Sequence, residues 1–271
     1  MNWLPPNGAL RGIGFDHLLR WNLDTIFWLF VASQVLIVLA MLLGALRRRP
    51  AQPATPAQPR SLAAFLFTSL LPLLAITALY IAMVATSHHL WAARREQPSA
   101  RNAIQVEVTG VQFAWYFRYP GNDGIYGRLL PGLVNAPAGN PLGLDPTDPH
   151  SRDDIVSPVL VLPAGRPVDL RLRSQDVIHG FFIPGMRLKQ DAIPGMVLHL
   201  QFTPEIPGVY PILCSQVCGL GHARMQTRLR VVSEAEFEHW IAAREPGAPP
   251  LSPAPGGRVG GAATSPAESR P

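Results

Sequence analysis

Cysteine and charge are both scarce in this sequence. Its 271 residues include only two cysteines, Cys214 and Cys218, and charged residues make up 15% of the chain. The motif Cys-x-x-Cys-His, which would attach a haem covalently, is absent, so we expect no fused c-type cytochrome domain. Because there is no third cysteine, we also expect no lipid anchor. The two cysteines therefore have to be explained together.

Two long segments near the N-terminus contain no charged residue. Residues 25–46 (TIFWLFVASQVLIVLAMLLGAL) and residues 62–87 (LAAFLFTSLLPLLAITALYIAMVATS) are each long enough to cross a bilayer core of about 30 Å. A signal peptide or a buried core helix is the alternative, but the first segment is too long for a signal peptide and lacks a small-residue cleavage site. Pro72 is tolerated in a membrane helix. We predict two transmembrane helices.

Acidic residues are absent from the segment between these helices, residues 47–61. It instead contains four arginines: Arg47, Arg48, Arg49 and Arg60. By the positive-inside rule this short loop is cytoplasmic, which places residues 1–24 and everything after the second helix on the exported side. These arginines supply most of the net charge of +5. The basicity therefore indicates membrane topology and not nucleic-acid binding.

From about residue 95 onward the period of the apolar residues changes from helical to two. In Val111–Tyr119 apolar or aromatic residues alternate with mostly polar ones. The same alternation occurs in Ile104–Thr109 and Val168–Arg173. Further strands are expected at residues 159–162, 197–203, 208–213 and 225–232. Glycine and proline separate these segments. We therefore predict that residues 95–245 form an antiparallel β-sandwich or barrel.

Two segments of this exported part do not read as strands. Residues 120–155 are too rich in glycine, proline and aspartate, and we predict a long solvated loop there. Its aspartates would favour a basic partner: Asp123, Asp145, Asp148, Asp153 and Asp154. After the last strand, Ser233 and Glu236 form a Ser-x-x-Glu capping box, which predicts a short helix. The Pro/Gly/Ala-rich residues 246–271 are expected to be disordered.

Cys214 and Cys218 lie in one loop, CSQVCGLGHARM, together with His222 and Met225. On the cysteines alone, a disulfide in an exported domain is as good an interpretation as a metal site. Thiolate, imidazole and thioether together suit copper, however, and two thiolates can bridge two copper ions into one compact centre. Such a centre needs one more imidazole, and His179 at the end of a predicted strand is the candidate.

The segments DVIHGFFIP, RLKQDAIPG and CSQVCGLGHARM occur in an order that resembles the CuA domain of cytochrome c oxidase subunit II. The two preceding membrane segments match this family as well, so the resemblance covers most of the chain up to about Trp240. It implies a two-helix transmembrane hairpin followed by an all-β, cupredoxin-like Greek-key domain. It also implies a binuclear copper centre with these ligands: His179, Cys214, the backbone carbonyl of Gln216, Cys218, His222 and Met225.

In this family the two cysteines bridge the metals. By position, His179 and Met225 would complete one copper, and His222 with the Gln216 carbonyl would complete the other. Gln216 itself stands where many members have a glutamate whose carboxylate helps to hold a magnesium ion at the subunit boundary. Copper needs only the main-chain oxygen, so the resemblance predicts the copper pair and leaves magnesium without one of its ligands.

The resemblance also gives roles to residues around the centre. Asp176 would orient the ligand loop, and Lys189 and Asp191 would face the catalytic subunit. Electrons would enter near Phe113 and Trp115, although Phe113 replaces a tryptophan of many family members. The packing of these rings in the core is an equally simple reading of the aromatic pattern.

For the whole chain, the resemblance implies an oxidase subunit in the plasma (inner) membrane of a bacterium, with its copper domain on the periplasmic side. Cytochrome c or a similar carrier would give electrons to the copper pair, which passes them to haem in subunit I, where oxygen is reduced to water; subunit III is a further expected partner. Two alternatives stay open, the CuA subunit of a nitric oxide reductase and a membrane-tethered copper chaperone. A quinol oxidase subunit would lack the copper ligands.

Overall fold

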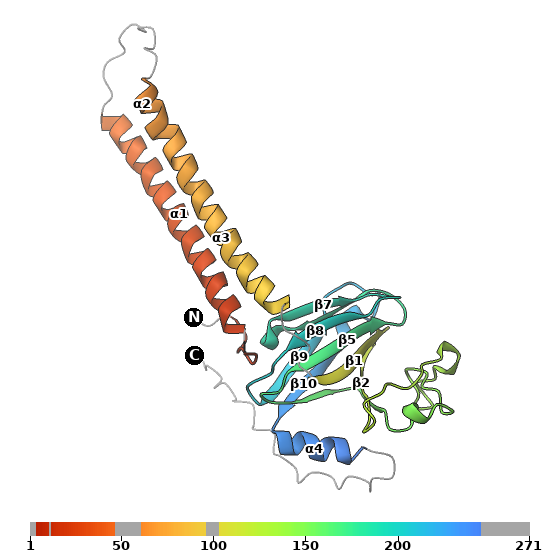
Figure 1. Cartoon of the computed structure of the whole chain (residues 1–271). Coiled ribbons are helices and arrows are strands. Elements are labelled where there is room, and N and C mark those ends of the chain that lie inside the picture. The colour runs from red at the N-terminus through yellow and green to blue at the C-terminus, as the bar shows by residue number, and fades with distance from the viewer. Residues whose placement is uncertain (1–3, 11, 47–60, 96–102, 245–271) are drawn as a thin grey trace, which may run out of the picture.

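The computed structural model describes residues 4–10, 12–46, 61–95 and 103–244. A pair of long helices is followed by a β-domain, as Figure 1 shows. The predicted cytoplasmic loop 47–61 lies outside the described residues except for Ser61, and the predicted disordered segment 246–271 lies outside them entirely.

Both predicted membrane segments are helical, and they lie side by side (Figure 1). The first is α1 (Gly12–Leu46), which begins well before the predicted span. The second consists of α2 (Leu62–Phe65), a π-helical turn η1 (Leu66–Leu70) and α3 (Leu71–Arg95). The π-helical turn ends next to Pro72, which has no N–H to continue the regular bonding of an α-helix.

Length, composition and exposure make these helices a membrane anchor. Two helices are long and apolar enough to cross a membrane, and none of the residues in their most apolar stretches is buried. The alternative of a buried core helix therefore describes neither of them, because a soluble protein would cover such surfaces.

The β-domain is a sandwich of two five-stranded sheets. The first sheet has the order β3 (Ile155–Ser157), β2 (Ala114–Tyr119), β1 (Ile104–Val111), β5 (Val168–Ser174) and β8 (Leu198–Phe202). The second has the order β4 (Leu160–Pro163), β10 (Gln226–Val232), β9 (Gly208–Cys214), β6 (His179–Ile183) and β7 (Leu188–Ala192). Two pairs are parallel, β1 with β5 and β4 with β10. The expectation of a purely antiparallel sandwich is wrong for these pairs, because the chain crosses between the sheets before it returns to each.

The core lies between the sheets. It includes fully buried side chains from both: Phe117, Leu160, Leu162, Leu170, Leu172, Phe181, Ile183, Ile212 and Leu229. Burying each of them stabilises the fold by about 1.5–3 kcal/mol relative to an exposed position. The helix α4 (Glu234–Ala242) closes one side, where the rings of Phe237 and Trp240 lie 6.4 and 5.1 Å from that of Tyr119. Its predicted cap is confirmed, since the Ser233 hydroxyl accepts a hydrogen bond from the Glu236 N–H at 3.3 Å.

The segment Val111–Tyr119 is not one strand as predicted. Strand β1 ends at Val111, the chain reverses through Gln112 and Phe113, and β2 begins at Ala114. Phe113 therefore lies in a turn and is 38% exposed, whereas Trp115, on β2, is only 2% exposed. Alternation alone misses this reversal because a two-residue turn leaves apolar residues on both sides of it.

The long loop 120–155 is folded onto the outer face of the first sheet and is not solvated throughout. Two 3₁₀ turns interrupt it, η2 (Pro131–Leu133) and η3 (Pro149–Ser151). Strand alternation places Glu107 and Arg118 on a polar outer face, yet they are only 1% and 2% exposed. The loop covers them.

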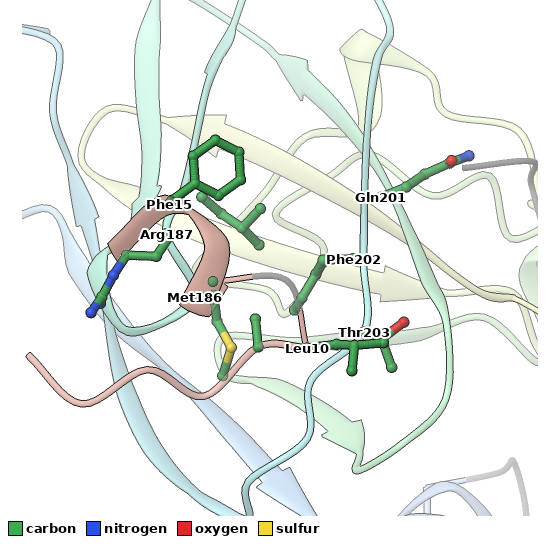
Figure 2. A pocket seen from close by; sticks show the side chains of 10 residues that line it. Leu10, Phe15, Met186, Arg187, Gln201, Phe202 and Thr203 are labelled. Carbon is green, nitrogen blue, oxygen red and sulfur yellow. The ribbon is translucent and has the colours of Figure 1, made fainter. Parts of the chain in front are cut away.

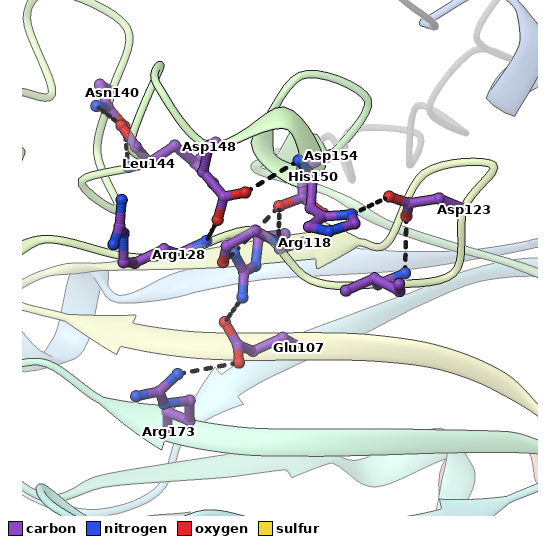
Figure 3. A network of polar contacts seen from close by, with 12 residues as sticks. Glu107, Arg118, Asp123, Arg128, Asn140, Leu144, Asp148, His150, Asp154 and Arg173 are labelled. Carbon is purple, nitrogen blue, oxygen red and sulfur yellow. Dashed lines mark hydrogen bonds and ion pairs between the residues drawn. The ribbon is translucent and has the colours of Figure 1, made fainter.

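A polar network joins this loop to the sheet (Figure 3). Arg118 forms ion pairs with Glu107 at 3.0 Å and with Asp154 at 3.2 Å, and Arg173 pairs with the other oxygen of Glu107 at 3.2 Å. Burial raises the pKa of Asp154 to about 6, against the attraction of Arg118. Breaking such a buried pair by removing one partner typically costs about 3–5 kcal/mol, so the network fixes the loop in place.

Other aspartates of the loop are bonded within it. Asp145 pairs with Arg128 at 2.6 Å, and Asp148 accepts a hydrogen bond from the Arg128 N–H at 2.8 Å. Asp123 lies 2.6 Å from His150, and this hydrogen bond lowers the pKa of Asp123. These carboxylates fold the loop, which therefore does not present the free acidic surface expected from its composition.

The segment ahead of α1 packs on the β-domain. The Gly8 N–H donates to the Gly185 carbonyl at 2.8 Å. The guanidinium of Arg187 donates to both carboxylate oxygens of Asp16 in α1, at 2.6 and 2.8 Å. Figure 2 shows the cavity beside this junction, which at about 20 Å³ holds about one water molecule. This packing ties the membrane helix to the domain.

Candidate metal centre

The predicted ligands lie at one end of the second sheet. His179 is the first residue of β6, and Cys214 is the last residue of the neighbouring β9. The register pairs Phe181 with Cys214, which brings these two strand ends together. Cys218 and His222 follow on the connecting loop, and Met225 immediately precedes β10. Residues far apart in sequence thus meet through the sheet.

The sulfur atoms form a compact cluster. Cys218 Sγ lies 3.8 Å from Cys214 Sγ, 3.8 Å from Met225 Sδ and 3.6 Å from His222 Nδ1. Cys214 Sγ lies 3.1 Å from the carbonyl oxygen of Gln216. Both cysteines are free, and their separation far exceeds a disulfide bond of about 2.05 Å. The disulfide alternative therefore does not describe this structure.

His179 is oriented by a carboxylate and leaves one nitrogen without a partner. Its Nε2 lies 2.7 Å from Asp176 Oδ1, while its buried Nδ1 has no hydrogen-bond partner among the described residues. One ligand atom from each of His179, Cys214 and Cys218 falls within 4.8 Å of the others. A buried nitrogen left over beside two thiols is what a thiophilic metal requires. The residues present therefore fit copper.

The surroundings of His179 leave little free space. Its side chain is fully buried, and the ring of Trp115 meets it edge-on with centroids 5.8 Å apart. A Cβ added at Gly110 would lie 2.8 Å from the His179 ring, so only glycine fits there. Trp115 is only 2% exposed and belongs to the core, so this ring has no exposed edge.

One carboxyl group and one thiol at this site have shifted pKa values. Burial opposes ionisation of Asp176, but hydrogen bonds from His179, Gln112 and Val177 hold its pKa below the ordinary value. Burial, reinforced by the neighbouring Cys214, raises the pKa of the Cys218 thiol to about 11. In the metal-free protein this thiol stays protonated at neutral pH, so binding a metal cation there releases a proton.

Sequence reasoning missed Gln112, which joins the two halves of the site. Its backbone N–H donates to Asp176 Oδ2 at 2.7 Å, and its side-chain amide donates to the Cys218 carbonyl, also at 2.7 Å. Next to it, the ring of Phe113 lies over the ligand loop so closely that a Cβ on Gly221 would overlap it. The turn between β1 and β2 thus forms one wall of the site.

Lys189 and Asp191 lie on β7, at the edge of the second sheet. Their charged groups are 3.7 Å apart, with side chains 52% and 36% exposed. They are not part of the sulfur cluster, although Asp191 pairs in register with Gly180, next to His179. The edge position leaves them accessible to a partner.

Known proteins resemble this domain. The family described as cytochrome c oxidase subunit II, periplasmic domain, matches residues 104–232. The alternative cytochrome c oxidase subunit 2 of Bradyrhizobium diazoefficiens is 39% identical over 142 residues, which cover 52% of this chain and 50% of that protein. The cytochrome c oxidase subunit 2 of Synechocystis is 35% identical over 145 residues, covering 54% of this chain and 34% of that protein.

A solved structure gives a comparison in three dimensions. The crystal structure of the periplasmic domain of subunit II of cytochrome oxidase of Bradyrhizobium japonicum aligns with 27% identity and a TM-score of 0.40, covering 54% of this chain and 95% of that one. The chain spans half or less of the length of the two curated relatives. The matched residues contain all the clustered ligands, and this family implies a copper centre at them. The β-domain of this chain, over residues 104–232, is thus similar to the periplasmic domain of cytochrome c oxidase subunit II.

Proposed function

We propose that this chain is the subunit through which electrons enter a respiratory terminal oxidase in the plasma membrane of a bacterium. Its β-domain would face the periplasm, take electrons from cytochrome c and deliver them to haem in subunit I for the reduction of oxygen to water. Subunit III completes the proposed complex. The observation that carries this proposal is the cluster of two free thiols, two imidazoles and a thioether on a membrane-anchored β-domain.

We assign the two-copper centre to six groups. They are the side chains of His179, Cys214, Cys218, His222 and Met225 and the backbone carbonyl of Gln216. When bound, a copper pair supplies one-electron redox chemistry with little reorganisation of its ligands. With Gln216 in place of glutamate, we do not assign a magnesium ion to the subunit boundary.

The protein's own contribution is a preformed set of donors. Asp176 fixes the tautomer of His179, so that Nδ1 is the nitrogen left for the metal. Gln112 holds the Cys218 loop against this pair. Trp115 excludes water from the buried side of the imidazole, and its ring is backed by that of Phe181 at 5.2 Å. Ligands held in this way have little freedom to move when the charge changes.

The surface over the ligand loop suits a protein donor. Phe113, Val217 and Leu220 are all solvent-exposed, with Val217 at 79%. Exposed apolar side chains grouped around one loop are typical of a protein contact site. We assign this surface to cytochrome c, and the β7 edge with Lys189 and Asp191 to subunit I.

The test is metal analysis of the full chain in detergent, combined with optical and electron spin resonance spectra. We expect two coppers that share one unpaired electron. Met225→Leu should keep both coppers and shift the reduction potential, whereas Cys218→Ser should abolish the shared-electron spectrum because one bridge is lost. One copper per chain, or a Cys214–Cys218 disulfide in the native assembly, would contradict the proposal.

A further inference from the structure

A polar cavity whose lining contains none of the metal-site residues lies under the loop 120–155. Its volume is about 530 Å³. The outer face of the first sheet forms its floor, through Glu107, Arg118, Arg171 and Arg173, and the loop forms its wall, through Tyr126 and its neighbours. Part of this floor is the network of Arg118, Glu107 and Arg173 in Figure 3.

The floor carries more positive than negative charge. Both oxygens of Glu107 are occupied, one by Arg118 and one by Arg173, and Arg118 also pairs with Asp154. Arg171 forms no ion pair with any carboxylate of the described residues. Three guanidinium groups thus face two carboxylates, and the surplus lies at Arg171, which is half-buried.

Tyr126 provides a second unsatisfied donor at the same place. Its ring lies against two guanidinium groups, with the central carbons of Arg118 and Arg171 at 4.7 and 5.0 Å from the ring centroid. Its hydroxyl oxygen is buried and has no hydrogen-bond partner within the described part of the chain. Because burial raises the pKa of Tyr126, this hydroxyl stays protonated and remains a donor.

We propose that this cavity binds a small oxyanion, held by Arg171, Arg173 and the hydroxyl of Tyr126. The unsatisfied groups are donors, so the missing component is an acceptor with negative charge. Guanidinium groups bind phosphate and carboxylate oxygens through paired, charge-assisted hydrogen bonds, which a monatomic anion cannot match in number. An oxyanion here would link strand β5 to the loop.

A neighbouring cavity bears on the source of the ligand. It has a volume of about 440 Å³ and shares Arg173 and Leu129 with the first. Its apolar lining includes Pro131, Val134 and Leu142. An organic oxyanion would place its hydrocarbon part in this second space, whereas inorganic phosphate would occupy only the first.

The test is calorimetric titration of the full chain in detergent, at constant ionic strength set with chloride. Inorganic phosphate and n-butyl phosphate are the probes. We expect saturable binding of one anion per chain at roughly millimolar concentration or lower. Tighter binding of butyl phosphate identifies an organic ligand, and equal or weaker binding identifies the inorganic ion.

Matched variants separate this site from general charge effects. Arg171→Gln should weaken binding at least about tenfold. Arg228→Gln removes an equal charge from an exposed position on the other sheet, and it should change the affinity less than twofold. Tyr126→Phe, which removes only a hydroxyl, should also weaken binding, and it replaces Arg171→Gln as the test if that variant fails to fold. Phosphate that binds no better than chloride, or equal losses in the two arginine variants, would overturn the proposal.

Discussion

Gln112 shows how one side chain can hold a metal site without touching the metal. Its two hydrogen bonds reach Asp176, which orients His179, and the carbonyl of Cys218. His179 begins β6 and Cys218 lies in the loop after β9, and Gln112 connects them at the turn between β1 and β2. Because the His179–Asp176 pair and the Cys218 loop are far apart in sequence, the chain itself does not fix their relative positions. The amide therefore positions the donors.

We expect Gln112→Ala to lower copper retention about tenfold in competition with a chelator, because supporting groups of this kind typically contribute 10- to 100-fold in metal affinity. The reduction potential should shift as well, since the Cys218 loop is freed. Gln226→Ala, an exposed glutamine on β10, is the matched control and should retain copper normally. Unchanged affinity and potential in the Gln112 variant would show that the loop holds its shape unaided.

At this scale the sequence indicates the donors better than their supports. The clustered cysteines, His222 and Met225 lie within one short segment, so their residue types alone point to a soft metal. Gln112 lies 106 residues away from the group it contacts. A glutamine carries no signal for such a role, because most glutamines are exposed.

Among the elements, the loop 120–155 differs most from its expected form. Composition predicts a solvated loop, yet Arg118, Glu107 and Asp154 tie it onto the sheet. Single-sequence patterns describe strands and do not show which loop covers an outer face.

The hairpin at Gln112 and Phe113, in contrast, is visible in the sequence pattern. The core-facing residues are even-numbered before it (Val106, Val108) and odd-numbered after it (Phe117, Tyr119). This change of phase marks the turn.

The raised pKa of Asp154 predicts a dependence of stability on pH. Its pKa is about 6 in the folded protein and about 4 in an unfolded chain, so the folded state binds the proton more tightly. As the pH rises from about 4 to about 6, ionisation of this buried carboxyl should lower the free energy of unfolding by on the order of 1–2 kcal/mol.

Asp154→Asn should remove this part of the pH dependence, which chemical unfolding of the chain between pH 4 and pH 7 will measure. Glu238→Gln, which removes an exposed carboxylate from α4, should leave it unchanged. A slope that persists in the asparagine variant would assign the effect to another carboxyl.

For the molecule as a whole, one partly buried ion pair fixes the membrane helix α1 to the β-domain. Asp16 of α1 and Arg187, which follows β6, form a two-pronged ion pair with side chains only 19% and 14% exposed. The two helices, the β-sandwich and the order of the site segments could all be predicted from periodicity and resemblance. This junction could not, because its partners are separated by 171 residues and neither belongs to a motif.

A double-mutant cycle with Asp16→Ala and Arg187→Ala should give a coupling free energy of about 1–3 kcal/mol in the unfolding of the full chain in detergent. The exposed pair Arg166–Glu234, at 42% and 41% exposure, is the control and should give less than about 1 kcal/mol. Equal coupling in both cycles would show that the junction is held by its apolar contacts instead.

The two parallel strand pairs have a consequence for biogenesis. The partner of β1 is β5, and the partner of β4 is β10, the last strand of the domain. Neither sheet can be completed from hairpins between consecutive strands alone. In the second sheet, β4 and β9 lack their shared neighbour β10 until residue 232 has been synthesised, so we expect the unfinished chain to depend on protection from aggregation during that interval.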